Sequence, residues 1–348
     1  MTELTNTWLQ FLERQGAQFD ESGRVAAFAP QPPGDTLQGF VAPLTDIGLI
    51  AVTGDDAPTF LHNQLTNDVE HLGASEARLA GYCSPKGRLL ATFIMWKRDA
   101  AIMLQLPKQI QPAVQKRLQM FVLRSKAKLA DVTGEYALLG LGGQGAAEAL
   151  KKWFPDLPAA PFAKTDTEHG TLIRLPDAFN APRYQWSMPA ALAEQAWPEL
   201  AARLATAGTG LWRLAEIQAG IPLVTQATQE QFVPQMVNYE LIGGVNFKKG
   251  CYPGQEIVAR SQYLGKLKRR MLLASVDTQD LAAGTEVFWS ADPEQPCGMV
   301  VNAERNPQGG TDCLVELKIA ATEEGTIHLG LPSGPVLRFT PLPYPLPA

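Results

Sequence analysis

The segment KGCYPGQE, residues 249–256, places a single cysteine between glycines, with a lysine before it and a carboxylate after it. Pro253 suits the first turn of a helix that GQEIVARSQYL can continue, so Cys251 is predicted at or just before a helix N-terminus. The partial positive charge at that end, together with Lys248 and Lys249, would favour the thiolate. The pattern therefore indicates a reactive cysteine, although CYPG is also typical of a plain turn.

Other candidates for thiol or metal chemistry are weaker. The four histidines, at positions 62, 71, 169 and 328, are scattered, and no Cys or His pair has the short spacing of a zinc or iron–sulfur site. No metal site is predicted, although one thiol could be a single ligand among several at an interface. Cys83, Cys297 and Cys313 are interpreted as small buried hydrophobic residues, because widely spaced free cysteines are usually buried.

A glycine motif, GLGGQG at residues 140–145, satisfies the GxGxxG pattern between a predicted strand and a predicted helix. In a dinucleotide-binding protein such glycines let the backbone approach a pyrophosphate at a helix N-terminus. The segment that follows, PDLPAAPFAKTDTEHG, is broken by prolines and does not have the pattern of a parallel strand leading to a ribose-binding acid. Nucleotide binding is therefore not predicted here.

A short basic run, GKLKRRM, follows the cysteine segment and contains Lys266, Lys268, Arg269 and Arg270. It is either a solvated linker or a surface for nucleic-acid phosphates. The formal net charge of −5 argues against a protein that coats nucleic acid nonspecifically, because that function needs a clustered basic surface. Direct contact with nucleic acid is therefore ranked last among the functions considered.

The elements that must position these residues follow from the hydrophobic periodicity. A helix is predicted over residues 3–15, and the break FAPQPPGD separates it from a first α+β unit over residues 36–133. The predicted elements of that unit are a strand at 48–54, a helix at 56–72, strands at 77–85, 88–98 and 101–107, and a helix at 109–123. The cysteine segment lies outside this unit.

A similar order of strand, glycine-containing turn and amphipathic helix returns in residues 134–208, which are interpreted as a second, related α+β unit. A ligand is expected at the seam between such copies. Residues 209–265 return to helix and loop and carry KGCYPGQE. In residues 266–348 short apolar runs alternate with Gly, Pro, Asn and Asp, which predicts an antiparallel β-barrel. With an N-terminal helix and linker at 1–35, the prediction is an α+β protein of five segments.

The composition is that of an ordinary globular protein, with 45% hydrophobic and 19% charged residues, and it excludes a disordered chain. No uncharged apolar run reaches the roughly 18 residues needed to span a bilayer. The N-terminal stretch lacks the basic and apolar regions of a signal peptide. A cytoplasmic protein without a membrane partner is therefore expected.

A longer block around the cysteine, FVPQMVNYELIGGVNFKKGCYPGQEIVAR, closely resembles the signature of the YgfZ family, folate-binding proteins related to the glycine cleavage T-protein, an aminomethyltransferase. TFLHNQLTNDVEHL, YCSPKGRLLATFIMW, AGIP and CGMVVNAE also resemble parts of that superfamily, so the likeness covers nearly the whole chain from about Gly39. It implies a ring of three domains, two α+β and one β-barrel, around tetrahydrofolate. It further implies a role in the synthesis or repair of iron–sulfur enzymes and, through a methylthiotransferase that carries such clusters, in tRNA modification.

The resemblance also assigns roles to residues. Cys251 is expected to be the reactive or redox-active group and Lys249 to tune it. The residues expected to contact tetrahydrofolate are Gln218, Tyr252, Gln255, Glu256, Asn67 and Trp96. The implied partners are folate and iron–sulfur proteins, and the basic run could then meet the anionic polyglutamate tail of a folate.

Two departures from the T-protein pattern shape the expected function. Leu90 and Ala91 stand where the aminomethyltransferases carry an acidic pair after a glycine turn, so the expected acid is missing. Gln218 stands where a pterin-reading glutamate is common, and its amide offers one acceptor oxygen in place of two; Glu216 would take the role if the alignment shifted. A folate-binding accessory factor is therefore favoured over a true aminomethyltransferase, with a tRNA-binding module third, and turnover is left open.

Overall fold

The computed structural model describes residues 3–29, 38–265 and 267–347. The chain forms two compact units. The first unit comprises Met1–Pro58, His71–Arg78 and Ile94–Trp212, and the second comprises Thr59–Glu70, Leu79–Phe93 and Arg213–Ala348. The predicted boundaries at residues 36 and 266, and part of the proline-rich break, lie outside the described residues, so the division into five segments stays a prediction.

The predicted N-terminal helix is confirmed as α1, which buries Trp8 and Leu12 in the core of the first unit. This is the apolar face that its amphipathic spacing predicts. The α-helices described are α1 (Glu3–Arg14), α2 (Ala57–His62), α3 (Gln111–Gln119), α4 (Ala146–Leu150), α5 (Ala190–Ala201), α6 (Thr209–Gln218) and α7 (Gln255–Tyr263). Short 3₁₀ helices are η1 (Pro234–Val237) and η2 (Ile319–Thr322), and a small hairpin pairs β1 (Ala17–Phe19) with β2 (Val25–Phe28).

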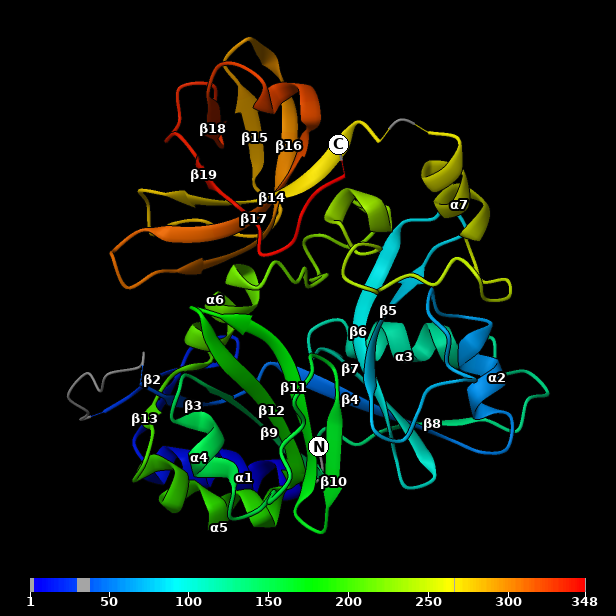
Figure 1. Cartoon of the computed structure of the whole chain (residues 1–348), viewed down its shortest axis with the longest axis vertical. Coiled ribbons are helices and arrows are strands. Elements are labelled where there is room, and N and C mark those ends of the chain that lie inside the picture. The colour runs from blue at the N-terminus through cyan, green and yellow to red at the C-terminus, as the bar shows by residue number, and fades with distance from the viewer. Residues whose placement is uncertain (1–2, 30–37, 266, 348) are drawn as a thin grey trace. The chain divides into compact units, whose positions relative to one another are not determined.

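A five-stranded sheet has the order β5-β6-β7-β4-β8 (Figure 1). Its strands are β4 (Ile47–Thr53), β5 (Ala77–Cys83), β6 (Leu89–Arg98), β7 (Ala101–Pro107) and β8 (Lys128–Asp131). The strands predicted for the first α+β unit are confirmed closely, because their apolar runs are nearly continuous and are buried in the sheet. Helix α3 is shorter at both ends than the predicted helix at 109–123.

A six-stranded sheet in the first unit has the order β10-β11-β12-β9-β3-β13. Its strands are β3 (Phe40–Pro43), β9 (Tyr136–Gly142), β10 (Lys164–Thr167), β11 (Gly170–Ala178), β12 (Ala181–Pro189) and β13 (Ala205–Thr206). Aromatic residues of strands and helices meet in its core, where the indole of Trp186 lies against Trp153 and Phe154. The strand, glycine-containing turn and helix predicted within residues 134–208 are present as β9, the turn after it and α4.

The C-terminal residues of the second unit form an antiparallel sheet that curls into a half-barrel (Figure 1, yellow to red). Its order is β18-β15-β16-β17-β14-β19. The strands are β14 (Arg269–Val276), β15 (Glu286–Trp289), β16 (Asp292–Arg305), β17 (Thr311–Lys318), β18 (Ile327–Leu329) and β19 (Arg338–Thr340). A bulge between Val300 and Asn302 interrupts the pairing of β16 with β17 and bends the sheet. The predicted barrel strands are thus present, in a more open sheet.

The predicted helix at 56–72 is wrong beyond His62, where α2 ends. The side-chain hydroxyl of Thr66 accepts the Gly81 amide at 2.7 Å and donates to the Gly244 carbonyl at 2.6 Å. These hydrogen bonds join the segment to partners far along the chain, and they replace the local bonds of a helix. The resulting loop, residues 63–70, forms part of the site described below.

The GLGGQG motif serves packing in this fold. Strand β9 runs antiparallel to both of its neighbours, β3 and β12, so it lies in no parallel dinucleotide-binding sheet. A Cβ atom on Gly140 would lie 2.3 Å from the ring of Trp212, and one on Gly142 would lie 2.5 Å from the ring of Phe40. These two glycines are needed because aromatic rings pack directly against the strand at both positions.

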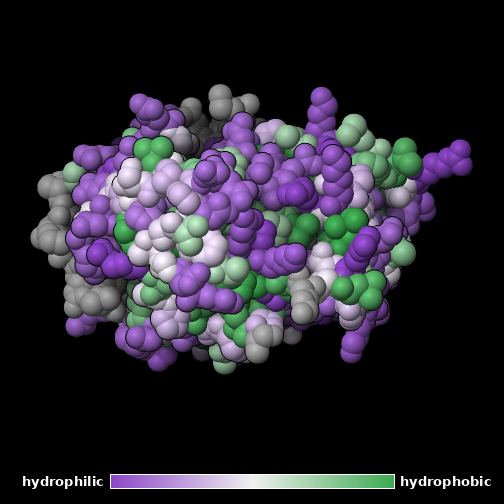
Figure 2. All heavy atoms as spheres, turned by 90° about the horizontal axis from the view of Figure 1, so that it is seen from above, coloured by the Kyte–Doolittle hydropathy of each residue, from purple (hydrophilic) through white to green (hydrophobic). Residues whose placement is uncertain are grey.

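The surface is polar in the view of Figure 2, where hydrophilic side chains cover most of the face and hydrophobic ones lie between them. Among the described residues, no helix is both long enough and apolar enough to cross a membrane.

Candidate functional site

Lys249 fixes the signature segment against the end of helix α2. Its ammonium group donates hydrogen bonds to the carbonyl oxygens of His62 and Leu65, the second at 2.8 Å. The same nitrogen lies 4.8 Å from the centroid of the Tyr252 ring, which is within range of a cation–π interaction. The lysine that is predicted to tune Cys251 therefore also anchors the loop that carries the thiol.

The surroundings of Lys249 lower the pKa of its ammonium group. Burial lowers the pKa of this lysine to about 8, while Asp68, Cys251 and Glu70 act in the opposite direction. Burial removes water from the ammonium group and so disfavours the charged form. Lys249 and Cys251 are thus electrostatically coupled, and the lysine can lose its proton in mildly alkaline solution.

Cys251 is the accessible thiol of the chain. All four cysteines lie in the described part of the structure; Cys251 is exposed, whereas Cys83, Cys297 and Cys313 are buried, as predicted. Burial raises the pKa of Cys83 and of Cys313 to about 12, and it also raises the pKa of Cys297. An electrophilic reagent or substrate would therefore meet the thiol of Cys251 first.

The helix after Cys251 begins later than predicted. Helix α7 starts at Gln255, and Pro253 belongs to the turn before it, so the prediction of Pro253 in the first helical turn is wrong. The reason is Gly254, which has a left-handed backbone with φ of 80°. A Cβ atom on this glycine would lie 2.4 Å from the carbonyl oxygen of Ser84. The turn of residues 84–87 thus holds the start of α7 at close range.

Tyr252 points its hydroxyl into the interior. The residue is 6% exposed, and its hydroxyl has no hydrogen-bond partner among the described residues. The neighbouring Ser84 is also buried, with a hydroxyl that lacks a described partner. Burial, with a smaller contribution from Cys83, raises the pKa of the Tyr252 phenol. Two unsatisfied hydroxyls therefore lie beneath the signature segment, where a buried polar group is costly without a partner.

Asn67 ties the loop after α2 to the chain before the signature. Its side-chain amide donates to the carbonyl oxygens of Leu79 and Gly243, both at 2.7 Å. Its own carbonyl oxygen accepts the Asp68 amide at 2.8 Å. Asn67, predicted to contact folate, therefore has its amide group engaged by the backbone and orders this loop.

His62 lies beside the signature segment, a placement that its isolated position in the sequence does not indicate. Its Nδ1 lies 3.1 Å from a carboxylate oxygen of Asp68 and 3.9 Å from one of Glu70. Its Nε2 lies 3.6 Å from the point where a Cβ atom of Gly250 would stand. We call Lys249, Cys251, Tyr252, His62 and Asp68 the signature cluster. The signal that could have found His62 is the block HNQLTND, whose turn brings Asp68 back to the histidine.

The other residues predicted to contact tetrahydrofolate near the signature lie in different surroundings from Tyr252 and Asn67. Gln255 is half-buried and Glu256 is exposed, both in the first turn of α7. Trp96 lies in β6, within the first unit, and is 1% exposed. The structure therefore brings Asn67 together with the signature cluster within the second unit, whereas Trp96 belongs to the other unit.

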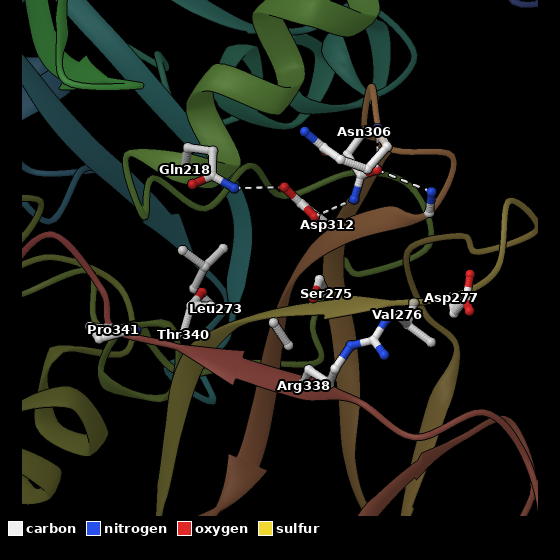
Figure 3. Close-up of a pocket in the computed structure, with 13 residues that line it drawn as sticks. Gln218, Leu273, Ser275, Val276, Asp277, Asn306, Asp312, Arg338, Thr340 and Pro341 are labelled. Carbon is white, nitrogen blue, oxygen red and sulfur yellow. Dashed lines mark hydrogen bonds between the residues drawn. The ribbon is translucent and has the colours of Figure 1, made fainter.

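Gln218 lies in a separate region, a cavity of about 440 Å³ in the second unit. The side-chain amide of Gln218, at the end of α6, donates to one carboxylate oxygen of Asp312 at 2.7 Å (Figure 3). The side chain of Asn306 donates to the other oxygen, also at 2.7 Å. Ser275, Asp277 and Arg338 line the same space, and the signature cluster does not. We call this region the Gln218 cavity.

Asp312 is the carboxylate beside Gln218 that the sequence did not indicate. It lies 94 positions after Gln218, in a strand whose alternation only marks it as polar. Glu216, the alternative pterin reader, is buried and forms an ion pair with Arg213 at 2.5 Å. A carboxylate beside Gln218 is thus provided by Asp312.

The basic run is largely neutralised by carboxylates. Arg269 forms two hydrogen bonds with the buried Glu316, one of them at 2.9 Å. Arg270 lies 2.5 Å from the buried Glu240. Lys268 is exposed, and Lys266 lies outside the described residues. The two arginines of the run therefore stabilise the C-terminal sheet and its contact with the segment around Glu240.

Comparison with solved structures identifies the fold. The chain is similar to glycine cleavage system aminomethyltransferase T from Bartonella henselae, with a TM-score of 0.76, 17% sequence identity and coverage of 94% of each chain. The predicted fold class is thereby confirmed: an α+β protein of the T-protein fold, with a curled antiparallel C-terminal sheet.

Comparison with curated sequences identifies the family. No protein-family model matches the chain. It is 31% identical over 327 residues to the tRNA-modifying protein YgfZ of Edwardsiella ictaluri, a match that covers 92% of this chain and 97% of that protein. It is 31% identical over 314 residues to the YgfZ protein of Photorhabdus laumondii, covering 89% and 94%. With the signature block in place and these matches along nearly its whole length, the chain belongs to the YgfZ family of tRNA-modifying proteins.

Proposed function

We propose that this protein binds tetrahydrofolate or a derivative and supports the synthesis or repair of iron–sulfur enzymes, and through them tRNA modification. The relatives' name supports the link to tRNA modification, and the T-protein fold supports the link to folate. The observation that carries the proposal is the exposed Cys251 on a loop that Lys249 anchors, while the other cysteines are buried. A single fixed and accessible thiol is suited to reactive or ligating chemistry.

The Gln218 cavity fits a folate ring in size and in chemistry. Small-molecule sites typically measure about 300 to 1,000 Å³, and this cavity measures about 440 Å³. A pterin presents a ring N–H beside an exocyclic amine, and a carboxylate can accept both hydrogens. Asp312 offers such a carboxylate, held by Gln218 and Asn306. Tetrahydrofolate bound there would supply a carrier of one-carbon units, and these residues would orient its ring.

A second function, a true one-carbon transferase, is less well supported by the residues present. Leu90 and Ala91 stand where the transferases carry acids, and both are buried in β6. Neither can assist a proton transfer. The arginines of the basic run are paired with carboxylates, which also weakens the proposal of a tRNA-binding surface. The accessory role therefore remains the proposal.

The experiment that tests the role of the thiol compares wild type with Cys251→Ala and Cys251→Ser in a bacterial strain that lacks its own family member. Wild type should restore methylthiolated tRNA, and both variants should fail. Titration calorimetry with tetrahydrofolate, on anaerobically purified protein, should show micromolar binding by all three. Full rescue by Cys251→Ala would contradict the role of the thiol, and no binding by wild type would contradict the folate proposal.

A further inference from the structure

The C-terminal tail, residues 341–347, follows strand β19 and alternates prolines with larger side chains. Leu342, Tyr344 and Leu346 are half-buried, whereas the prolines between them are exposed. Proline lacks the backbone N–H that strand pairing needs, and its ring restricts φ, so such a tail has little backbone entropy to lose when it is held in place. The position of the tail on the protein therefore depends on its three half-buried side chains.

Tyr344 binds the end of helix α6. Its hydroxyl donates a hydrogen bond to the carbonyl oxygen of Gly220 at 2.8 Å. Gly220 has a left-handed backbone with φ of 66°, and its amide donates back to the carbonyl oxygen of Ile217, an arrangement typical of a glycine that ends a helix. A Cβ atom on Gly220 would lie 2.6 Å from the ring of Tyr344. The glycine of the AGIP block is thus needed where the tail packs against it.

The same tail forms part of the Gln218 cavity. Thr340 and Pro341, where the tail begins, line this space (Figure 3). Gln218, whose side chain donates to Asp312, lies two positions before Gly220. The tail therefore reaches the cavity in two ways, through its own first residues and through the end of α6.

We propose that Tyr344 is a positioning residue for ligand recognition in the Gln218 cavity. Its hydroxyl holds Gly220 and the last turn of α6, and this keeps the side-chain amide of Gln218 on the carboxylate of Asp312. Without that hydrogen bond the end of α6 can move relative to β17, and the carboxylate loses one of the donors that orient it. The inference rests on the proposed function in one respect, that tetrahydrofolate binds in this cavity.

The surroundings of Tyr344 keep its phenol a hydrogen-bond donor. Burial raises the pKa of this phenol to about 12, with a smaller contribution from Glu240, whereas the side chain of Asn238 and the charge of Arg270 act in the opposite direction. The hydroxyl therefore keeps its proton at neutral pH, and the bond to Gly220 does not depend on the ionisation of the tyrosine.

The test is the affinity for tetrahydrofolate, measured by titration calorimetry on anaerobically purified protein, in wild type and Tyr344→Phe. This variant keeps the ring and removes only the hydroxyl. We expect the dissociation constant to rise about fivefold, which is roughly the contribution of one hydrogen bond. Tyr263→Phe is the matched control, because Tyr263 of α7 is 69% exposed, and this variant should bind as wild type does.

A double substitution distinguishes positioning from a general loss of structure. If Tyr344 acts through Gln218, Tyr344→Phe should cause no further loss of affinity in protein that already carries Gln218→Ala. An equal loss in that background, or an unchanged affinity in the single variant, would overturn the inference. Urea unfolding checks the fold, and if Tyr344→Phe does not fold, a chain that ends at Leu342 takes its place.

A labelling experiment decides the inference without tetrahydrofolate. In a Cys251→Ala background, Ser275→Cys places an accessible thiol in the cavity, since the three remaining cysteines are buried. We expect Tyr344→Phe to increase the rate of its alkylation by iodoacetamide about threefold, because a loosened wall opens more often. Equal rates with and without the hydroxyl would overturn the inference. If wild type binds no tetrahydrofolate, the proposed function fails, and this rate still shows whether Tyr344 shapes the cavity.

Discussion

The signature cluster and the Gln218 cavity lie in the same unit but are built in opposite ways. In the signature cluster, side chains are held by the backbone: Lys249 bonds two carbonyl oxygens, and the adjoining Asn67 bonds two more. In the Gln218 cavity, side chains hold one another, with Asp312 between Gln218 and Asn306. The first arrangement leaves one thiol exposed, and the second leaves a space of ligand size.

This difference predicts that some substitutions change the reactivity of the Cys251 thiol and others change the affinity for tetrahydrofolate. A change that loosens the backbone under the signature cluster should alter the thiol and the stability of the fold. A change at Asp312 should act mainly on the recognition of a ligand, because its carboxylate lines the Gln218 cavity between Gln218 and Asn306. Under the proposed function, the signature cluster provides the thiol and the Gln218 cavity binds the ligand.

Gly254→Ala should have the largest effect, because it acts on the signature cluster in two ways. A left-handed backbone costs an alanine about 1 kcal/mol or more. The added methyl would also meet backbone atoms of Ser84 and Gly87 at 2.4 and 2.6 Å. We expect the free energy of unfolding, measured with urea, to fall by about 3 kcal/mol.

The matched control is Gly243→Ala. Gly243 has nearly the same φ, 81°, but apart from its chain neighbours no heavy atom of the described residues lies within 4 Å of its Cβ position. This variant should lose only the backbone cost of about 1 kcal/mol. Equal losses for the two variants would show that the turn of residues 84–87 does not constrain the start of α7.

Asp312→Asn should weaken tetrahydrofolate binding by about tenfold, because hydrogen bonds to a charged acceptor are worth roughly 1.5 to 3 kcal/mol. Titration calorimetry measures the effect, and alkylation of Cys251 should be unchanged. Asp277→Asn is the control, since this aspartate is exposed and also lines the cavity. An unchanged affinity in Asp312→Asn would place the ligand outside the Gln218 cavity.

Much of the fold was predictable because the relevant signals are local. Apolar runs such as AIMLQLP are buried along their length and read directly as strands. The segment that carries the accessible thiol could also be singled out, because KGCYPGQE is contiguous and its glycines and lysine act on their neighbours; the reactivity of Cys251 stays a prediction. Gly254 shows the limit of such local signals, since its left-handed backbone delays the helix that Pro253 would otherwise start.

The rest depends on contacts between distant segments. The helix predicted at 56–72 is cut short because Thr66 bonds Gly244, 178 positions away. Asp312 reaches Gln218 only when the C-terminal sheet has formed. His62 faces the signature segment because Lys249, 187 positions later, bonds its carbonyl oxygen. Periodicity cannot report such pairs, because each partner has an ordinary local sequence.

The smallest predicted effect is the change of stability with pH that follows from the lowered pKa of Lys249. Its pKa is lowered by burial from 10.5 to about 8, so the unfolded chain binds more protons than the folded one between these values. Stability should therefore rise with pH across that window, as the cost of a buried ammonium is relieved. Relative to Lys249→Met, wild type should gain about 1 kcal/mol between pH 8 and 10.5, after allowance for solvent screening. Lys248→Met, at an exposed lysine, should show no such difference from wild type. If stability varied with pH in parallel for wild type and Lys249→Met, the Lys249 ammonium would remain hydrated in the folded protein.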